Sequence, residues 1–199
     1  MLKAVLLVCA LCQPSSAQAA KNILVFGDSL SAGYGIAAEK SWPQLLQQEL
    51  KHSHPGFTIV NASISGETTV GGRQRIIKAL EQHRPAIVIV ALGANDGLRG
   101  YRISDAEANL GEIINQAKRS RAKVLLAGMK LPPNYGKTYI TDFENMYSRL
   151  AAKHRIRLLP FLLEGVAPEQ FQADNLHPTA EAQPRIMRNV MRKLKLLLN

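Results

Sequence analysis

The chain has 199 residues, 46% of them hydrophobic and 20% charged, and a formal net charge of +10 at neutral pH. This length suits one domain with a substantial core, and we find no linker, internal repeat or low-complexity segment that would divide it. Both cysteines, Cys9 and Cys12, lie near the N-terminus, which excludes disulfide bonds and cysteine metal sites from the rest of the chain.

The first 19 residues have the pattern of a secretory signal peptide. Lys3 supplies a short basic region, residues 4–11 are apolar, and Ala17-Gln18-Ala19 matches the small-x-small cleavage rule. The apolar stretch is too short to span a bilayer, and a buried N-terminal helix is the alternative. We therefore expect residues 1–19 to be removed and residues 20–199 to form a single domain, periplasmic or secreted.

Five apolar runs predict strands, and the segments between them predict helices. The strands are expected at residues 23–26, 57–60, 86–92, 123–127 and 156–159. The helices are expected at residues 41–51, 73–83, 104–119 and 141–154, with a last helix beginning near Thr179. Ser41 is a candidate N-cap, and Ser104 with Glu107 three residues later predicts a capping box. Strands that alternate with helices predict an α/β fold, in which a parallel sheet is covered on both faces.

The last helix is amphipathic and basic. Its apolar side chains recur at helical spacing: Ile186, Met187, Val190, Met191, Leu194 and Leu197. Between them lie the cations Arg185, Arg188, Arg192, Lys193 and Lys195. A solvated face above a core-facing stripe explains this pattern, and weak contact with an anionic membrane surface is the alternative. No nucleic-acid-binding motif accompanies these charges, so we expect no nucleic-acid partner.

The sequence Gly27-Asp28-Ser29-Leu30 comes directly after the first predicted strand and places a serine just past its end. Residues at the carboxyl end of a strand lie where open α/β folds bind their ligands, and Gly27 permits a sharp turn there. The Ser29 hydroxyl is therefore a candidate nucleophile, provided that a base reaches it. The alternative is that Ser29 or Asp28 merely caps the following segment.

The candidate base lies near the other end of the chain, in Asp174-Asn175-Leu176-His177-Pro178. A spacing of three residues lets the carboxylate and the imidazole lie on one side of a turn. Asp174 then accepts the Nδ1 proton of His177 and leaves Nε2 free to take the proton of a serine. An incidental histidine on a surface loop is the alternative, which the presence of Ser29 disfavours.

Two further loops follow predicted strands and offer hydrogen-bond donors. Gly66 permits a close backbone approach, so its N–H is a candidate donor to a developing oxyanion, and the Asn95 side-chain amide is another. Taken alone, Gly66 is explained equally well by turn geometry, and the Asn95-Asp96-Gly97 sequence indicates a turn. Together with Ser29 and His177, they would meet at one edge of the sheet.

These four blocks, in this order, resemble those of the SGNH hydrolases, also called the GDSL family. The resemblance runs from about Asn22 to Pro184, and residues 61–66, 93–100 and 131–136 resemble the branch of periplasmic thioesterases, lysophospholipases and arylesterases. It implies a three-layer α/β/α, flavodoxin-like fold with a parallel sheet of about five strands. The α/β-hydrolase motif Gly-x-Ser-x-Gly is not matched, since Ser31 holds its final position.

The resemblance also implies a site and an activity. Ser29 would be the nucleophile, His177 the base and Asp174 its partner, with an oxyanion hole formed by the Ser29 and Gly66 backbone amides and the Asn95 side chain. The implied reaction is hydrolysis of small-molecule acyl esters and thioesters, lysophospholipids included, through an acyl-enzyme on Ser29. No metal or organic cofactor has a role in it, and we expect a monomer.

Substrate choice is expected to lie in two loops. Residues 97–101 suggest a mobile flap, with a plain surface turn as the alternative, and residues 131–135 suggest a stiffer wall. Leu98, Leu131 and Tyr135 would then line an apolar groove.

Two other functions stay open: a carbohydrate O-deacetylase on the same scaffold, and a non-catalytic module that binds anionic surfaces through the basic C-terminal helix.

Overall fold

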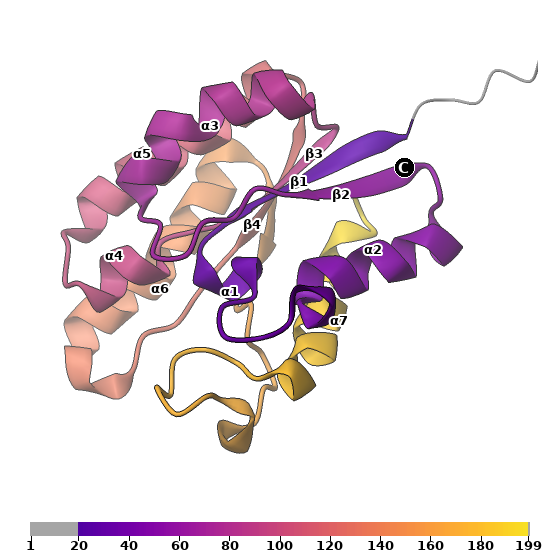
Figure 1. Cartoon of the computed structure of the whole chain (residues 1–199). Coiled ribbons are helices and arrows are strands. Elements are labelled where there is room, and N and C mark those ends of the chain that lie inside the picture. Colours follow the sequence, from indigo (N-terminus) through magenta and orange to yellow (C-terminus); the bar gives the residue numbers. More distant parts are fainter. Residues whose placement is uncertain (1–19, 199) are drawn as a thin grey trace, which may run out of the picture.

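Five parallel strands run through the centre of the computed structural model, which describes residues 20–198 (Figure 1). The strands are β1 Lys21–Gly27, β2 Phe57–Asn61, β3 Ile87–Ala91, β4 Lys123–Ala127 and β5 Arg157–Leu159. Their order in the sheet is β2-β1-β3-β4-β5, and each neighbouring pair is parallel. This is the flavodoxin-like order, whose ligand-binding crevice lies between the carboxyl ends of β1 and β3. All five predicted strands are confirmed, with small shifts of their ends.

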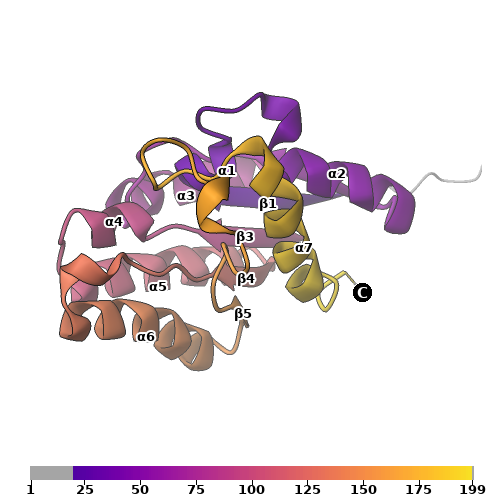
Figure 2. The ribbon, with the colours of Figure 1, turned by 90° about the horizontal axis from the view of Figure 1, so that it is seen from below.

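Helices cover both faces of this sheet (Figures 1 and 2). They are α1 Ser29–Ala32, α2 Trp42–Ser53, α3 Thr69–His83, α4 Ala94–Leu98, α5 Ile103–Arg119, α6 Lys137–His154 and α7 Gln183–Leu194. Short 3₁₀ turns lie at Ala38–Lys40, Pro133–Tyr135, Pro168–Gln170 and Ala180–Ala182. On one face α3 packs on α5 and α5 on α6, whereas α2 packs on α7 on the other. The predicted three-layer α/β/α fold is therefore confirmed.

The central strands are buried on both faces, which explains their unbroken apolar sequences. Every residue of β3 is buried, and so are the residues of β1 from Ile23 onward. The edge strands β2 and β5 are only partly buried. Because β1 and β3 are neighbours in the sheet, the segments that leave their carboxyl ends emerge side by side.

Helix α3 begins at Thr69, four residues before the predicted start, although glycines at positions 71 and 72 weaken a helix. The Thr68 side chain caps the helix by accepting a hydrogen bond from the Gly71 N–H. A Cβ atom at Gly72 would lie 2.5 Å from Leu92 Cδ1. A larger residue at position 72 would therefore push Leu92 aside, and this close packing explains a glycine in α3 despite its low helix propensity.

The predicted capping box at Ser104 is wrong. Helix α5 begins at Ile103, and Arg102 rather than Ser104 occupies the N-cap position. Ile103 is 5% exposed, so the first residue of α5 is packed in the core. Glu107 instead pairs with Arg149 of α6, at 2.6 Å between Oε2 and Nη2.

Three other helices also differ from the prediction at their N-terminal ends. Ser41 occupies the N-cap position of α2 as predicted, but its hydroxyl donates to the Ala38 carbonyl and makes no cap hydrogen bond. Helix α6 begins at Lys137, directly after Gly136, whose φ of 85° places it in the left-handed region. The last helix is preceded by the 3₁₀ turn and starts at Gln183, whose Oε1 accepts the Trp42 N–H of α2 at 3.0 Å.

The packing of the basic C-terminal helix agrees with a solvated face above a core-facing stripe. Ile186, Val190 and Leu194 are each 0% exposed, so one stripe of α7 faces the core. Within residues 20–198 no helix combines the length and hydropathy needed to cross a bilayer. The predicted signal peptide, residues 1–19, lies outside the described residues.

Candidate active site

Ser29 is the first residue of α1 and is separated from the end of β1 only by Asp28. Asp28 is the N-cap, and its Oδ1 accepts the Leu30 N–H at 3.1 Å. Gly27 is the last residue of β1 and serves close packing rather than the expected turn. A Cβ atom there would lie 2.7 Å from Ser31 Oγ. The strand end and the cap together fix the Ser29 side chain at the carboxyl edge of the sheet.

The loop before α7 carries Asp174 and His177 on one side, as the spacing predicts. Asp174 Oδ1 accepts the backbone N–H groups of Leu176, at 2.9 Å, and His177, at 3.0 Å. Asn175, between them, has a φ of 57° and makes the turn tight. Asp174 Oδ2 lies 2.7 Å from His177 Nδ1. The carboxylate thus holds both the backbone of the turn and the imidazole ring.

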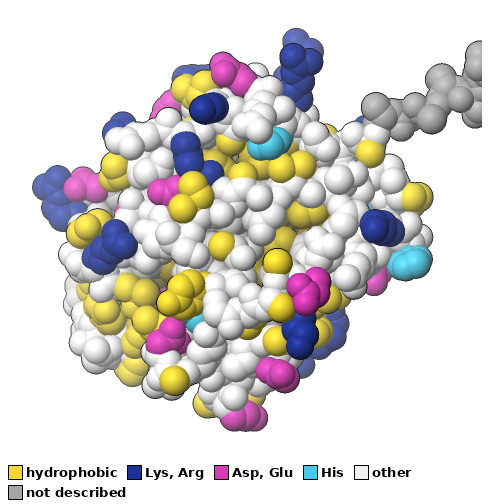
Figure 3. Space-filling model, viewed as in Figure 1, with side chains coloured by type: hydrophobic (Ala, Val, Ile, Leu, Met, Phe, Trp, Pro, Cys, Tyr) yellow, Lys and Arg dark blue, Asp and Glu magenta, His cyan; other side chains and the backbone are white. Residues whose placement is uncertain are grey.

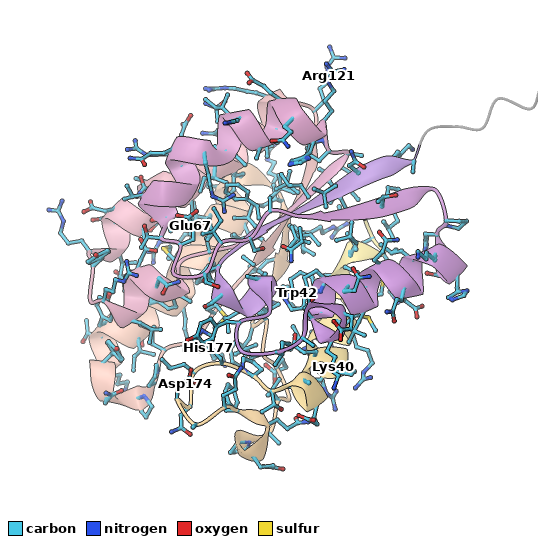
Figure 4. All side chains as sticks on the ribbon, viewed as in Figure 1. Lys40, Trp42, Glu67, Arg121, Asp174 and His177 are labelled. Atoms are coloured by element: carbon cyan, nitrogen blue, oxygen red, sulfur yellow. The ribbon has the colours of Figure 1, made fainter. Side chains whose placement is uncertain are left out.

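The structure brings this pair to Ser29 across 148 residues of sequence. His177 Nε2 lies 2.8 Å from Ser29 Oγ. Figure 4 shows Asp174 and His177 side by side, below α1. Asp174 accepts from Nδ1–H, so Nε2 is left as the acceptor for the serine hydroxyl. Serine, histidine and aspartate are therefore arranged for general-base activation of the hydroxyl.

The same contacts keep Asp174 ionised. Its pKa is lowered from 3.8 to about 2, first by the backbone N–H of His177 and then by the His177 ring and the Leu176 N–H. A carboxylate is favoured by donors to its charged form, and these contacts supply three. Asp174 therefore stays negative in any mildly acidic solution and remains available to the imidazole.

Gly66 and Asn95 also lie at this edge of the sheet. Gly66 has a φ of 78°, which favours glycine, and Asn95 lies in the first turn of α4, just after β3. Asn95 Nδ2 donates to the Glu67 carbonyl at 3.0 Å, which orients the amide. One N–H of that amide remains for another acceptor. The two predicted oxyanion donors are thus on adjoining segments next to Ser29.

Asp96 secures the helix that carries Asn95. It is 2% exposed, and its oxygens accept the Thr69 N–H at 2.9 Å and the Thr69 hydroxyl at 2.6 Å. Asn109 of α5 donates to the same hydroxyl at 3.2 Å. These bonds join α4, α3 and α5, a connection that the Asn95-Asp96 sequence alone does not reveal.

A cavity of about 360 Å³ opens beside Ser29 and His177. Its walls include the apolar side chains Leu30, Leu98, Met129, Leu131, Phe161, Leu163, Phe171 and Leu176. Hydrophobic side chains gather at the lower left of Figure 3, next to the region where Figure 4 places His177. Of the three residues predicted to line a groove, Leu98 and Leu131 line this cavity, and their contact with substrate stays a prediction. Tyr135 is not among the lining residues, and its hydroxyl donates to the Leu98 carbonyl at 2.8 Å.

The segment 97–101 is held by tyrosines of a neighbouring segment. Gly97 and Leu98 form the end of α4, and Tyr139 donates to the Tyr101 carbonyl at 2.7 Å. A Cβ atom at Gly97 would lie 2.7 Å from both Leu131 and Phe143, so this glycine allows close packing. The expected mobility of this segment stays a prediction.

Two residues at the site were missed by the sequence reasoning. The Tyr34 ring lies 4.6 Å from the His177 ring, measured between centroids. Gln172 Nε2 donates to the Tyr34 carbonyl at 2.9 Å and to the Pro178 carbonyl at 3.2 Å. The Gln172 N–H also donates to the His177 carbonyl, at 2.8 Å. Gln172 thus joins the segment after α1 to the loop that carries His177, a link without any local sequence signal.

Asp28 is a buried carboxyl directly beside the nucleophile candidate. Burial raises its pKa from 3.8 to about 7, against the opposing effect of backbone hydrogen bonds. The folded protein therefore holds a proton that the unfolded chain releases near its ordinary pKa. This stabilisation is full below about pH 4 and is lost as the pH rises toward about pH 7.

Replacing Asp28 with Asn keeps the cap and removes this titration. Between about pH 4 and pH 7 we expect the wild type to lose on the order of 3 kcal/mol of unfolding free energy relative to Asp28→Asn. Urea unfolding of both proteins at several pH values measures the difference. Parallel pH profiles for the two proteins would contradict the raised pKa.

No group of three or more His, Cys, Asp or Glu side chains in residues 20–198 is placed to hold a metal ion. Around its apolar cavity the site offers a hydroxyl, an imidazole, a carboxylate and amide donors. These are the groups of a serine acyl hydrolase.

Comparison with known proteins agrees with this chemistry. Residues 25–184 match the model of the GDSL-like Lipase/Acylhydrolase family. The chain is 43% identical to an arylesterase of Vibrio mimicus, over 98% of both chains. It is 41% identical to the thioesterase 1/protease 1/lysophospholipase L1 of Escherichia coli, over 92% of this chain and 88% of that protein.

A solved structure agrees with the fold. The crystal structure of TesA superposes with a TM-score of 0.87 and 44% sequence identity, covering 89% of this chain and 99% of that one. The matched family segment includes Ser29, Gly66, Asn95, Asp174 and His177. The chain belongs to the GDSL-like lipase/acylhydrolase family and is a hydrolase.

Proposed function

We propose that the protein is a serine esterase that hydrolyses acyl esters and thioesters through an acyl-enzyme on Ser29. The observation that carries this proposal is the chain of short contacts from Ser29 Oγ through the His177 ring to Asp174, at 2.8 and 2.7 Å. A serine is a weak nucleophile unless a base accepts its proton, and this arrangement supplies the base.

The first half of the reaction forms the acyl-enzyme. Ser29 Oγ attacks the acyl carbonyl while His177 Nε2 takes the hydroxyl proton, and Asp174 stabilises the imidazolium. The tetrahedral intermediate then collapses, the bond to the alcohol or thiol breaks, and the leaving group takes the proton from His177. In the second half, water gives its proton to His177 and attacks the acyl-enzyme, and Ser29 recovers its proton as the acid leaves.

The oxyanion of both intermediates would be held by the N–H groups of Ser29 and Gly66 and the side-chain amide of Asn95. Ser29 is the first residue of a helix, so its N–H has no partner within that helix. The Glu67 carbonyl orients the Asn95 amide from the adjoining segment. Loss of one such donor typically raises the barrier by about 3 kcal/mol.

The apolar cavity favours an acyl chain as the group bound beside Ser29. Eight of its nineteen lining residues are leucine, methionine or phenylalanine, and these side chains suit an alkyl chain better than a sugar ring. The relatives named arylesterase and thioesterase/lysophospholipase support the same substrate classes. A carbohydrate O-deacetylase remains the second candidate, because it would use the same serine and histidine.

A panel of substrates separates these candidates. We expect turnover of p-nitrophenyl esters, acyl-CoAs and lysophospholipids, with kcat/KM rising with acyl length until the cavity is filled. The same assay with acetylated sugars should give little turnover. A preference for acetylated sugars over every longer acyl ester would replace the esterase proposal with the deacetylase one.

Leu98 offers the test of the cavity wall. Leu98→Ala removes apolar contact with the acyl chain, worth about 0.8 kcal/mol per buried methylene group lost. We expect kcat/KM for medium-chain esters to fall by roughly 10-fold, while acetate esters, too short to reach the residue, change little. Steady-state rates for a series of p-nitrophenyl esters measure this. An equal loss at every chain length would contradict the role of Leu98.

We also propose that the protein acts after export, with residues 1–19 as its signal peptide. The basic, apolar and small-residue pattern of that segment supports export. N-terminal sequencing of the protein recovered from the periplasm or medium tests this, with Ala20 as the expected first residue.

The substrates would be small molecules. Weak contact of the basic helix α7 with anionic lipid is a further prediction, which vesicle binding at low and high salt tests.

A further inference from the structure

Arg75, in the second turn of α3, contacts three parts of the chain at once. Its Nε pairs with Glu67 Oε2, and its Nη1 donates to the Ala62 carbonyl at 2.8 Å. Its guanidinium carbon lies 3.8 Å from the centre of the Phe26 ring. The Arg75 and Glu67 side chains are 22% and 11% exposed, so this ion pair is largely shielded from water. Such a pair is screened less than an exposed one.

The three partners of Arg75 surround the segment that carries Gly66. Ala62 and Glu67 lie at the two ends of residues 62–67, and Phe26 lies beneath, one residue before the end of β1. The Ile64 N–H donates to the Gly27 carbonyl at 3.0 Å, which ties the middle of the segment to the residue before Asp28. One guanidinium therefore fixes both ends of a six-residue segment against the strand that leads to Ser29.

Glu67 connects this ion pair to Asn95. Its side chain pairs with Arg75, while its backbone carbonyl accepts Asn95 Nδ2 at 3.0 Å. A Cβ atom at Gly71 would overlap Glu67 Oε1, so the carboxylate packs closely on the first turn of α3. The N-terminal end of a helix favours a negative charge, which further localises Glu67 there. Moving the Glu67 backbone would move both the Gly66 N–H and the acceptor that orients Asn95.

We propose that Arg75 is a positioning residue for the oxyanion hole: together with Glu67 it sets the positions of the Gly66 N–H and the Asn95 amide. This inference rests on the proposed function, because it assigns a purpose to donors that the acyl-transfer reaction uses. None of these contacts of Arg75 is with Ser29 or His177: two are with the ends of the segment 62–67 and the third is with the Phe26 ring. Its effect is therefore expected on stabilisation of the tetrahedral intermediates and not on the base.

The chemistry of arginine explains why a lysine would not replace it. A planar guanidinium offers donors in a fixed fork, so Nε and Nη1 reach a carboxylate and a carbonyl together while the flat face lies on an aromatic ring. An ammonium is a single strongly hydrated point charge without such a face. Arg75→Lys keeps the charge but loses the fixed geometry.

Three variants test the proposal: Arg75→Met, Arg75→Lys and Glu67→Gln. We expect kcat for p-nitrophenyl esters to fall roughly 10- to 100-fold in both Arg75 variants, since misplacing catalytic donors by about 1 Å costs up to about 100-fold. KM should stay within about two-fold, because the oxyanion forms only after the substrate is bound. The pH dependence of kcat/KM should keep its wild-type inflection, because His177 and Asp174 are untouched.

Arg149→Met is the matched control. Arg149 also makes a close ion pair, with Glu107 at 2.6 Å, but on the outer side of α5 and α6. Arg149→Met removes one guanidinium group, as Arg75→Met does, and should leave kcat and KM unchanged. Glu67→Gln carries the test if Arg75→Met does not fold, because it keeps the size of the side chain and removes only its charge. We expect it to lower kcat several-fold with an unchanged KM.

A double-variant cycle with Asn95→Ala is the sharpest readout. If Arg75 acts through the oxyanion donors, the loss from Arg75→Lys should shrink once the Asn95 amide is gone, so the two losses are less than additive. Fully additive losses, an unchanged kcat in the Arg75→Lys and Glu67→Gln variants, or a loss confined to KM would each overturn the proposal. A wild-type protein without esterase activity would instead refute the proposed function itself, which keeps the two failures distinguishable.

Discussion

Replacing Ser29 with alanine is expected to abolish ester hydrolysis, lowering kcat by a factor on the order of 10⁶. The Ser29 hydroxyl is the group that would form the acyl-enzyme, and its oxygen lies 2.8 Å from His177 Nε2. Alanine leaves no atom that can attack the carbonyl. The residual rate should come only from substrate binding and the oxyanion donors.

The variant should fold as the wild type does. Ser29 begins a short helix, where alanine has the better helix propensity, and Asp28 still caps that helix. Steady-state rates with p-nitrophenyl butyrate, together with circular dichroism and thermal unfolding, measure both effects. Ser31→Ala is the control within the same helix, because the Ser31 hydroxyl is buried and has no hydrogen-bond partner in the described part of the chain. Retained turnover in Ser29→Ala would refute the assignment of the nucleophile.

Asp174→Asn is expected to cost about 10³- to 10⁴-fold in kcat at neutral pH, as in other serine hydrolases of this design. The asparagine carbonyl oxygen can still accept the N–H groups of Leu176 and His177, so the turn is kept. Its amide nitrogen then faces His177 Nδ1 and donates to it. The imidazole is forced into the tautomer whose Nε2 carries a proton, which prevents Nε2 from accepting the serine proton.

Two measurements check this explanation of the Asp174→Asn variant. Thermal unfolding should resemble that of the wild type, and KM should change far less than kcat. Asp174→Ala should be the less stable of the two variants, because it also removes the acceptor of two backbone N–H groups. An Asp174→Asn rate within about ten-fold of the wild type would mean that the carboxylate does not set the tautomer.

The central strands of this fold could be predicted well because burial on both faces demands unbroken apolar sequences. The starts of α3 and α5 could not, because they depend on tertiary contacts. Helix α3 begins before two glycines since Gly72 must approach Leu92, and α5 begins at Ile103 since that side chain is buried. Helix propensity and capping patterns describe a segment in isolation, so they predict neither the packing of Gly72 on Leu92 nor the burial of Ile103.

The site was predictable where each residue follows a strand or belongs to a short motif. Ser29, Gly66 and Asn95 follow strands, and Asp174 and His177 are three residues apart, so the parallel topology brings them together. The hydrogen bond from the Tyr135 hydroxyl to the Leu98 carbonyl, by contrast, has no pattern in the sequence. The link from Gln172 to Tyr34 spans 138 residues and has no sequence pattern.

The role of each glycine was the hardest feature to predict from the sequence. Gly66 and Gly33 have positive φ angles, as turn glycines do. Gly27 and Gly97 instead allow close packing, because a Cβ atom at either position would force neighbouring side chains to shift. The sequence does not distinguish these two kinds of glycine. Only the backbone angles and the packing around each glycine show whether it forms a turn or allows neighbouring side chains to approach closely.

The central claim is that Ser29, activated by His177, becomes acylated during turnover. Peptide mapping by mass spectrometry after reaction with an activated phosphonate ester tests it most directly, because the phosphorus centre is attacked as the carbonyl is and the product does not turn over. We expect one stable adduct, on the peptide that contains Ser29, and none in Ser29→Ala, with the loss of esterase activity proportional to the labelled fraction. Complete inactivation with the adduct on any other residue, or full labelling of Ser29 with activity retained, would contradict the account.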